Sequence, residues 1–254
     1  MAGPRLLSAS ARTPEHGRET PSPAPERWDL ETLARAKPLT SWMFDQFAWA
    51  AKGSCAEVGA GIGTFSARLL AAGVETLLLI EPEAACVDVL VERFADEPRV
   101  RIAREALPEA RSLLAEPSAF DFVLCQNVLE HVRDDARAVE VMASSLRRGG
   151  RLTLLVPAGP RLFGPLDRMY GHERRYTHDS LRAVVERAGL RVTNLYPFNL
   201  LRIVGWWAKN STRAASIGRR SLAIYDALLP VWRPLEDRLP LPWGLSLIAH
   251  AERP

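Results

Sequence analysis

Cysteine is scarce in this chain of 254 residues. Its three cysteines, Cys55, Cys86 and Cys125, lie far apart within apolar segments, a spacing that fits neither a metal-binding cluster nor a disulfide framework. We therefore expect buried thiols in a reducing cytoplasm and no bound metal. Long hydrophobic runs are also lacking: no segment offers about 18 uninterrupted apolar residues, so no transmembrane helix is expected. The N-terminus lacks the apolar core of a signal peptide.

An excess of charge of one sign is missing too. The formal net charge is +3, and no basic stripe interleaved with aromatic residues is apparent outside 197–238, so nucleic-acid binding is not expected. Hydrophobic residues make up 47% of the chain and charged residues 25%, which is typical of a globular protein with a sizeable core. The length suits one α/β domain with additions rather than two full domains.

Three glycines at every second position stand out in the first half of the chain. Gly59, Gly61 and Gly63 follow a short apolar run, and a helix-like segment begins at Phe65. Glycine lets the backbone turn sharply and leaves no Cβ in the way of a ligand. The helix that follows directs free N–H groups toward the turn. This pattern predicts a nucleotide-like cofactor at the turn, with Ala60 among its contacts.

The central part of the chain alternates between predicted strands and predicted helices. Strands are expected near 53–58, 74–80, 99–103, 120–125, 150–156, 190–196 and 244–251, and helices near 64–72, 82–95, 107–115, 134–147 and 178–188. Such alternation with continuous apolar strands favours a parallel sheet covered on both faces. Ligands bind such sheets outside the carboxyl ends of the strands, so the loops at 59–63, 81, 104–106 and 125–131 should converge on one site.

The glycine spacing separates two cofactor classes. A dinucleotide fingerprint places its third glycine at position 64, where this chain has Thr64. The string Glu57-Val58-Gly59-Ala60-Gly61-Ile62-Gly63 instead resembles the first motif of class I S-adenosylmethionine (SAM)-dependent methyltransferases. The resemblance implies that Glu57 precedes glycines lying beneath the amino acid end of SAM. It also implies that Glu81, with Pro82 beside it, holds the ribose.

Two further segments extend this resemblance over about residues 40–196. In the segment Ala103–Leu107, Glu105 with its neighbour Ala106 either contacts adenine, as the resemblance implies, or is a solvated loop residue. The segment Cys125-Gln126-Asn127-Val128-Leu129-Glu130-His131-Val132 resembles the part of the family that closes over the methionine end of SAM. There Gln126, Asn127 and His131 would line the pocket, with His131 either structural or catalytic. The family fold is Rossmann-like, with a seven-stranded, mostly parallel sheet, an antiparallel last strand and helices on both faces.

A polar loop at 163–177 holds the candidate substrate residues. His172 is the candidate base, because a nucleophilic oxygen or nitrogen must lose its proton and histidine titrates in the right range. Asp167 would orient His172, and Tyr170 completes the catalytic candidates. Tyr170 and Tyr176 would shape the pocket, and Arg174 and Arg175 would hold an anionic group. Alternatively, His172 and the two arginines tie the loop to the sheet and cap the next helix.

The flanking segments complete the expected organisation. Residues 1–27 are expected to be a disordered leader. Residues 28–51 should form two amphipathic helices broken at Pro38, which either cover the cofactor or simply pack on the core 52–196. Residues 197–241 form an insertion, and 242–254 the terminal strand. The insertion combines apolar and basic side chains, which suits peripheral membrane contact at the inner face, a cap over a lipid-like substrate, a pocket wall or a homodimer contact.

The sequence therefore predicts a SAM-dependent methyltransferase acting on a small-molecule or lipid-linked acceptor. The string Gly-His-x-Arg-Arg-Tyr at 171–176 resembles a subgroup often seen in bacterial natural-product and glycan biosynthesis. A non-catalytic cofactor-binding or scaffold protein on the same fold is the main alternative, followed by an NAD(P)-dependent oxidoreductase. Whether oxygen, nitrogen or carbon receives the methyl group stays open.

Overall fold

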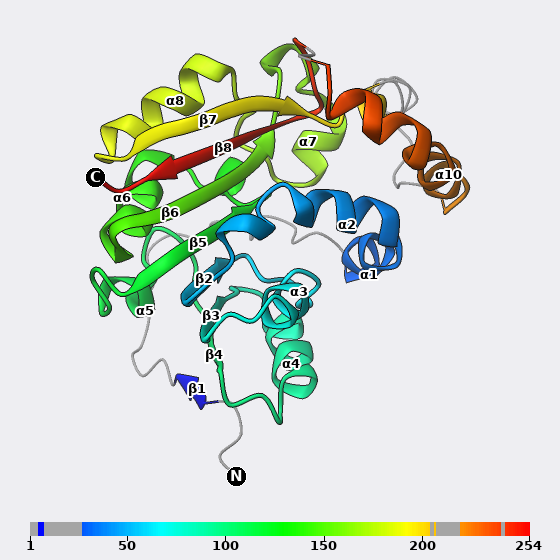
Figure 1. The fold of residues 1–254 in the computed structure, drawn as a ribbon. Coiled ribbons are helices and arrows are strands. Elements are labelled where there is room, and N and C mark those ends of the chain that lie inside the picture. The colour runs from blue at the N-terminus through cyan, green and yellow to red at the C-terminus, as the bar shows by residue number, and fades with distance from the viewer. Residues whose placement is uncertain (1–4, 8–26, 204–205, 207–218, 240–241) are drawn as a thin grey trace.

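The computed structural model describes residues 5–7, 27–203, 206, 219–239 and 242–254. Within these ranges one sheet of eight strands runs through the molecule in the order β1-β4-β3-β2-β5-β6-β8-β7 (Figure 1). The strands are β1 (Arg5–Leu7), β2 (Ser54–Val58), β3 (Thr76–Ile80), β4 (Val100–Ala103), β5 (Phe120–Gln126), β6 (Leu146–Pro157), β7 (Arg191–Phe198) and β8 (Ser246–Glu252).

The direction of the strands agrees with the expected fold class. Strands β1 to β6 pair in parallel, whereas β8 lies antiparallel between β6 and β7. All seven strands expected from the apolar runs are present, and β6 begins earlier than expected, at Leu146. The Rossmann-like, mostly parallel sheet with an antiparallel last strand is thus confirmed.

The segment expected to be a disordered leader contains one short strand. Residues Arg5–Leu7 form β1, which pairs in parallel with β4, so the sheet has one strand more than expected. The physical reason is the edge of β4, because an edge strand presents unpaired N–H and C=O groups to any extended segment. Residues 8–26 lie outside the described part of the chain.

The helices expected along the core are present but mostly shorter. They are α3 (Ser66–Ala71), α4 (Ala84–Arg93), α5 (Arg111–Leu114), α6 (Asp135–Ser145) and α8 (His178–Arg187). The substrate loop contains a further short helix, α7 (Pro165–Met169), which the sequence pattern did not predict. Short 3-10 helices occur at Ala48–Ala50, Leu129–His131 and Pro160–Leu162.

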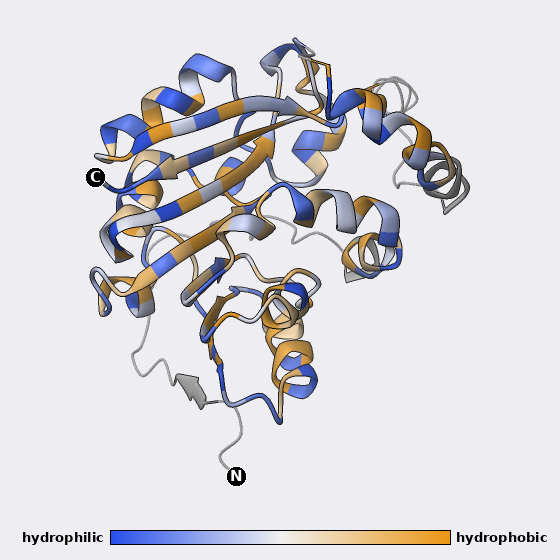
Figure 2. Ribbon diagram, viewed as in Figure 1, coloured by the Kyte–Doolittle hydropathy of each residue, from blue (hydrophilic) through white to orange (hydrophobic). Residues whose placement is uncertain are grey.

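Helices cover both faces of the sheet, and alternate residues of a strand face opposite sides. In β2, Ala56 and Val58 belong to the apolar cluster that includes residues of α6 and α8, whereas Cys55 belongs to the cluster with α2, α3 and α4. Figure 2 shows hydrophobic residues along the strands and alternating hydrophobic and hydrophilic residues along α8, as expected for a helix with one buried side.

The N-terminal helices lie on the same face of the sheet as α3 and α4. Helices α1 (Arg27–Arg35) and α2 (Lys37–Asp45) are separated at Ala36, two residues before the expected break, because Pro38 fits in the first turn of α2. Trp42 of α2 packs on Phe198 with ring centroids 4.4 Å apart, and its Nε1 donates to Asp237 at 2.9 Å. Helix α2 is thereby joined to the region around α10 (Arg219–Glu236). Among the described residues, no helix is long and apolar enough to cross a membrane.

Candidate functional site

The glycine turn connects β2 to α3 at the carboxyl end of the sheet. The backbone N–H groups of Gly59 and Ala60 donate to the Ile80 carbonyl at 2.8 and 3.2 Å, which ties the turn to the end of β3. Gly59 and Gly63 have φ values of +75° and +79°. A Cβ at Gly59 would lie 2.1 Å from Val128 Cγ2, and one at Gly63 would lie 2.8 Å from the Phe94 ring. Both positions therefore require glycine because the packing is tight.

Gly61 differs from its neighbours because space remains above it. Its φ is +54°, and the nearest atom to a Cβ built there is in Leu30 of α1, at 3.5 Å. Helix α1 thus lies over the glycine turn, although its role as a lid stays a prediction. The Gly61 N–H donates to Glu81 Oε2 at 2.8 Å, and the Glu83 N–H donates to Glu81 Oε1 at 3.0 Å. Burial raises the pKa of Glu81.

These features fit the expected cofactor. A carboxylate oxygen that accepts one backbone N–H keeps a second lone pair, so Glu81 can still accept from a hydroxyl pair. Glu57 is buried beneath the turn and accepts from the Ser66 hydroxyl, and burial raises its pKa to about 8. Glu57 therefore has a structural bond to α3, and the contact of Glu81 with a ribose stays a prediction.

Replacing Glu81 by alanine is expected to weaken cofactor binding by about 1–3 kcal/mol, because ribose hydroxyls would lose a buried acceptor. Titration calorimetry with S-adenosylhomocysteine measures the change. Glu83→Ala is the matched control, since Glu83 is an exposed neighbouring carboxylate and the variant keeps the backbone N–H that donates to Glu81. Equal affinity in wild type and Glu81→Ala would show that another residue holds the ribose.

Glu105, the residue expected to contact adenine, bonds to Ser112 in this structure. Glu105 Oε2 accepts from the backbone N–H of Ser112 at 3.0 Å and from its hydroxyl at 2.6 Å, so it stabilises the start of α5. Ala106 and Pro82 are exposed. The adenine role of Glu105 and Ala106 stays a prediction.

A cavity of about 220 Å³ lies next to the glycine turn, at the carboxyl ends of β5 and β6. Leu30 contributes to its wall and is also the residue above Gly61, so the cavity and the turn share a boundary. The lining residues are Leu30, Thr32, Leu33, Leu39, Asn127, Glu130, Pro157, Tyr170, His172, Arg175, Arg202, Trp206, Leu245 and Ser246. The structure thus brings four predicted residues together here: Asn127, Tyr170, His172 and Arg175.

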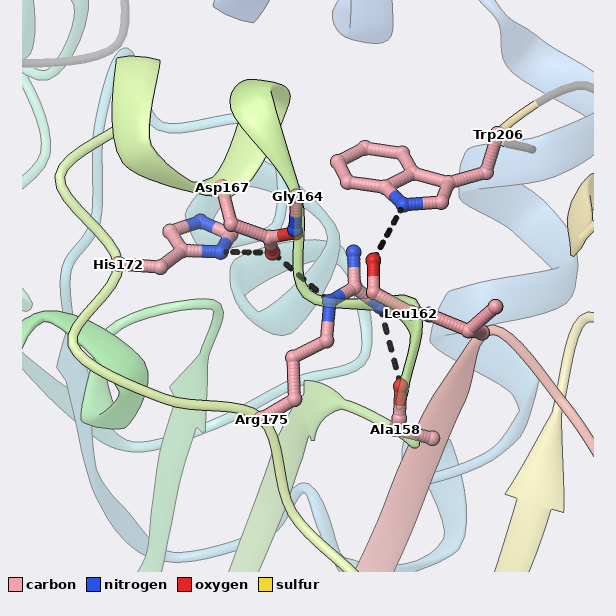
Figure 3. Close-up of polar contacts among 7 residues, drawn as sticks. All are labelled: Ala158, Leu162, Gly164, Asp167, His172, Arg175 and Trp206. Atoms are coloured by element: carbon pink, nitrogen blue, oxygen red, sulfur yellow. Dashed lines mark hydrogen bonds and ion pairs between the residues drawn. The ribbon is translucent and has the colours of Figure 1, made fainter. Parts of the chain in front are cut away.

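Asp167 is the polar centre of the substrate loop (Figure 3). Its side chain is fully buried, and its Oδ1 lies 2.9 Å from His172 Nδ1 and 2.8 Å from Arg175 Nε. The Gly164 N–H donates to Oδ2 at 2.8 Å. Burial raises the pKa of Asp167, but the bond from His172 and the charge of Arg175 outweigh it and hold the pKa below its usual value. An ionised Asp167 only accepts, so His172 Nδ1 carries a proton and Nε2 is left for other partners.

The two adjacent arginines have different surroundings. Arg175 is buried, donates from NH1 to the Ala158 carbonyl at 3.0 Å and lies 4.5 Å from the centre of the Trp206 ring. Arg174 pairs with Asp135 at 2.8 Å and donates to the Arg133 carbonyl. Neither Arg174 nor Tyr176 is among the residues that line the cavity, and the Tyr176 hydroxyl donates to Asp135. These two side chains connect the loop to the start of α6, whereas the structural alternative expected contacts to the sheet and the next helix.

The remaining predicted residues lie just outside the cavity. Gln126 ends β5, and its Oε1 is buried without a hydrogen-bond partner among the described residues. The ring of His131 packs edge-on against His172, with centroids 4.8 Å apart. Burial, and then the neighbouring His172, lower the pKa of His131 to about 4, so its ring is neutral at physiological pH.

Among the charged and aromatic lining residues, Glu130, Arg202 and Trp206 were not predicted as site residues. Glu130 directly follows two apolar residues, Val128 and Leu129, which is only a weak sequence signal of a buried acid. Arg202 and Trp206 come from the insertion, whose position relative to the loop the sequence does not encode locally.

A glycine turn at the carboxyl end of a doubly covered parallel sheet, with a carboxylate at the end of the next strand, defines a nucleotide-type cofactor-binding protein. Residues 56–152 match the model of a methyltransferase domain. No curated protein sequence matches the chain. This match covers the strands and helices around the glycine turn, and it supports SAM as the cofactor.

Solved structures confirm the fold. A geranyl diphosphate methyltransferase in complex with SAM is 14% identical, with a TM-score of 0.59 over 92% of this chain and 93% of that one. A SAM-dependent methyltransferase from Archaeoglobus fulgidus is 13% identical, with a TM-score of 0.59 over 90% of this chain and 100% of that one. The [4+2]-cyclase SpnF is 17% identical, with a TM-score of 0.56 over 85% and 80%. The last comparison shows that this fold also serves other chemistry.

Proposed function

We propose that this protein is a SAM-dependent methyltransferase whose acceptor is a small or lipid-linked molecule bound in the cavity beside the glycine turn. The observation that supports this most is the shared wall: Leu30 lies over Gly61 and also lines the cavity that contains His172. Gly61 and Glu81 would hold SAM, which supplies an electrophilic methyl group when bound. The cavity would place the acceptor beside it, and such alignment provides much of the catalysis.

His172 is the proposed proton acceptor. Asp167 fixes its orientation through Nδ1, which leaves Nε2 available for a nucleophilic hydroxyl or amine. His172 also lines the cavity and keeps 12% of its side chain exposed, so an acceptor can approach it. Tyr170 lines the same wall, which fits its proposed part in shaping the site.

We assign the anion contact to Arg202 rather than to Arg174 and Arg175. Arg174 and Arg175 are both engaged with carboxylates, whereas Arg202 lines the cavity without an ion pair at contact distance among the described residues. Burial lowers the pKa of Arg202 despite the nearby Asp226. A phosphate or carboxylate on the acceptor would compensate this buried charge.

Lipid-linked acceptors and peripheral membrane contact gain support from α10. Leu228, Val231 and Leu235 are exposed on this helix, with 72% of Val231 accessible. A membrane surface or a second copy of the chain would cover these side chains. Two basic residues of the insertion, Lys209 and Arg213, lie outside the described residues.

The first test is a calorimetric titration with S-adenosylhomocysteine and, in parallel, with NADH. Micromolar binding of the first and no binding of the second is expected. Transfer of labelled methyl groups from SAM into small-molecule and lipid extracts then detects the acceptor. Binding without any transfer would favour the scaffold alternative or other chemistry on this fold, and binding of NADH alone would overturn the proposed function.

A further inference from the structure

Three potential metal ligands meet beside the cavity, from two distant parts of the chain. Glu130 and His131 belong to the 3-10 helix that follows β5, and His172 follows α7. One ligand atom from each residue lies within 4.8 Å of the other two. Two imidazoles and one carboxylate form a donor set that suits divalent first-row transition metals.

Each histidine ring is held in place by a hydrogen bond from one of its nitrogens. Nδ1 of His172 donates to Asp167, which is itself held by Arg175 and by the Gly164 N–H. The ring of His131 bonds to the backbone of Gly171. Metal-binding histidines usually donate their second ring N–H to a carboxylate or a backbone carbonyl in this way, which fixes the ring and leaves the other nitrogen for the ion.

Glu130 supplies an independent observation. Only 1% of this residue is exposed, and its Oε2 has no hydrogen-bond partner among the described residues. A buried carboxylate oxygen without a partner is costly. A cation between Glu130 and the two rings would provide that partner.

We propose that Glu130, His131 and His172 bind one divalent transition-metal ion, of the Zn²⁺ or Mn²⁺ class. Ligand atoms around such an ion lie about 3–3.5 Å apart, given metal–ligand distances near 2.1 Å, so the three side chains would draw together on binding. Glu130 and His172 both line the cavity, which leaves the open side of the ion facing the acceptor.

The ion would change how the acceptor loses its proton. The ion would supply Lewis-acid chemistry, so that an acceptor hydroxyl beside it would lose its proton to water more easily. The acceptor oxygen would then form a bond to the methyl group of SAM as the bond from that methyl group to sulfur breaks, and S-adenosylhomocysteine would be the leaving group. In the metal-loaded protein His172 is then a ligand, and in the metal-free protein it is itself the base. This role rests on the proposed function, whereas the binding of the ion does not.

The test measures metal binding directly on the full-length protein. After removal of metal with a chelator, titration with Co²⁺ should give visible absorption bands typical of protein-bound cobalt, with one ion per chain, and Zn²⁺ should displace it. His131→Ala and His172→Ala should each weaken binding by at least about 100-fold. Asp167→Asn removes the charge that orients His172 and pairs with Arg175, and it should weaken cobalt binding by about 10- to 100-fold.

His178→Ala is the matched control, because His178 is exposed at the start of α8. It should bind cobalt like wild type. Glu130→Gln keeps the shape of the buried side chain but removes its charge. A thermal melt of this variant shows whether a loss of cobalt binding comes from lost ligation or from lost folding. Unsaturable cobalt binding, or equal binding by wild type and the two histidine variants, would overturn the site. S-adenosylhomocysteine binding, measured in the same samples, reports separately on the proposed function.

Discussion

Gly61→Arg is expected to abolish binding of S-adenosylhomocysteine. Gly61 has a left-handed φ of +54°, and the space above it ends at Leu30, 3.5 Å from the position of a Cβ. An arginine there would strain the turn, fill the space between the turn and α1, and bring a cation against Glu81, whose Oε2 accepts from the Gly61 N–H. Titration calorimetry should show no heat of binding at ligand concentrations that saturate wild type.

Gly73→Arg is the matched control for this substitution. Gly73 also has a positive φ, +90°, but a Cβ there would meet nothing within 4 Å. The two variants therefore share the backbone strain and differ in what the side chain blocks. Thermal melts should show comparable losses of stability, while only Gly61→Arg loses the ligand. Retained tight binding by Gly61→Arg would contradict the assignment of the glycine turn as the cofactor site.

The core of the fold was predictable because its signals are local. Continuous apolar runs identify strands buried on both faces, and the glycines at 59, 61 and 63 identify the turn without tertiary information. The extra strand β1 was not predictable, because three residues in a polar leader pair only when an open sheet edge lies beside them. Helix α5 proved shorter than expected since Glu105 caps its first turn at Ser112.

The site was only partly predictable. Asp167 and His172 lie five positions apart in one loop, so their contact follows from local sequence. Arg174 and Arg175 are equivalent in sequence, yet one side chain reaches α6 and the other the cavity, because adjacent side chains of an extended segment point to opposite sides. The meeting of Glu130 with His172 depends on how two distant loops pack, which spacing alone does not encode.

His172→Ala is expected to lower methyl transfer by about 10²- to 10⁴-fold, since loss of a positioned base or of a ligand for an activating ion each removes a contribution of this size. Binding of S-adenosylhomocysteine should stay close to wild type, because His172 lies in the acceptor cavity and not at Gly61 or Glu81. Transfer of labelled methyl groups to the acceptor found in the extract screen measures the change, with His178→Ala as the control.

If His172→Ala keeps wild-type turnover, acceptor activation by this residue is wrong, and carbon methylation or pure positioning by the cavity would gain support. If the variant is inactive but chelators and added metal leave wild-type activity unchanged, His172 acts as the base itself. If wild-type activity instead rises and falls with cobalt or zinc occupancy, His172 acts as a metal ligand.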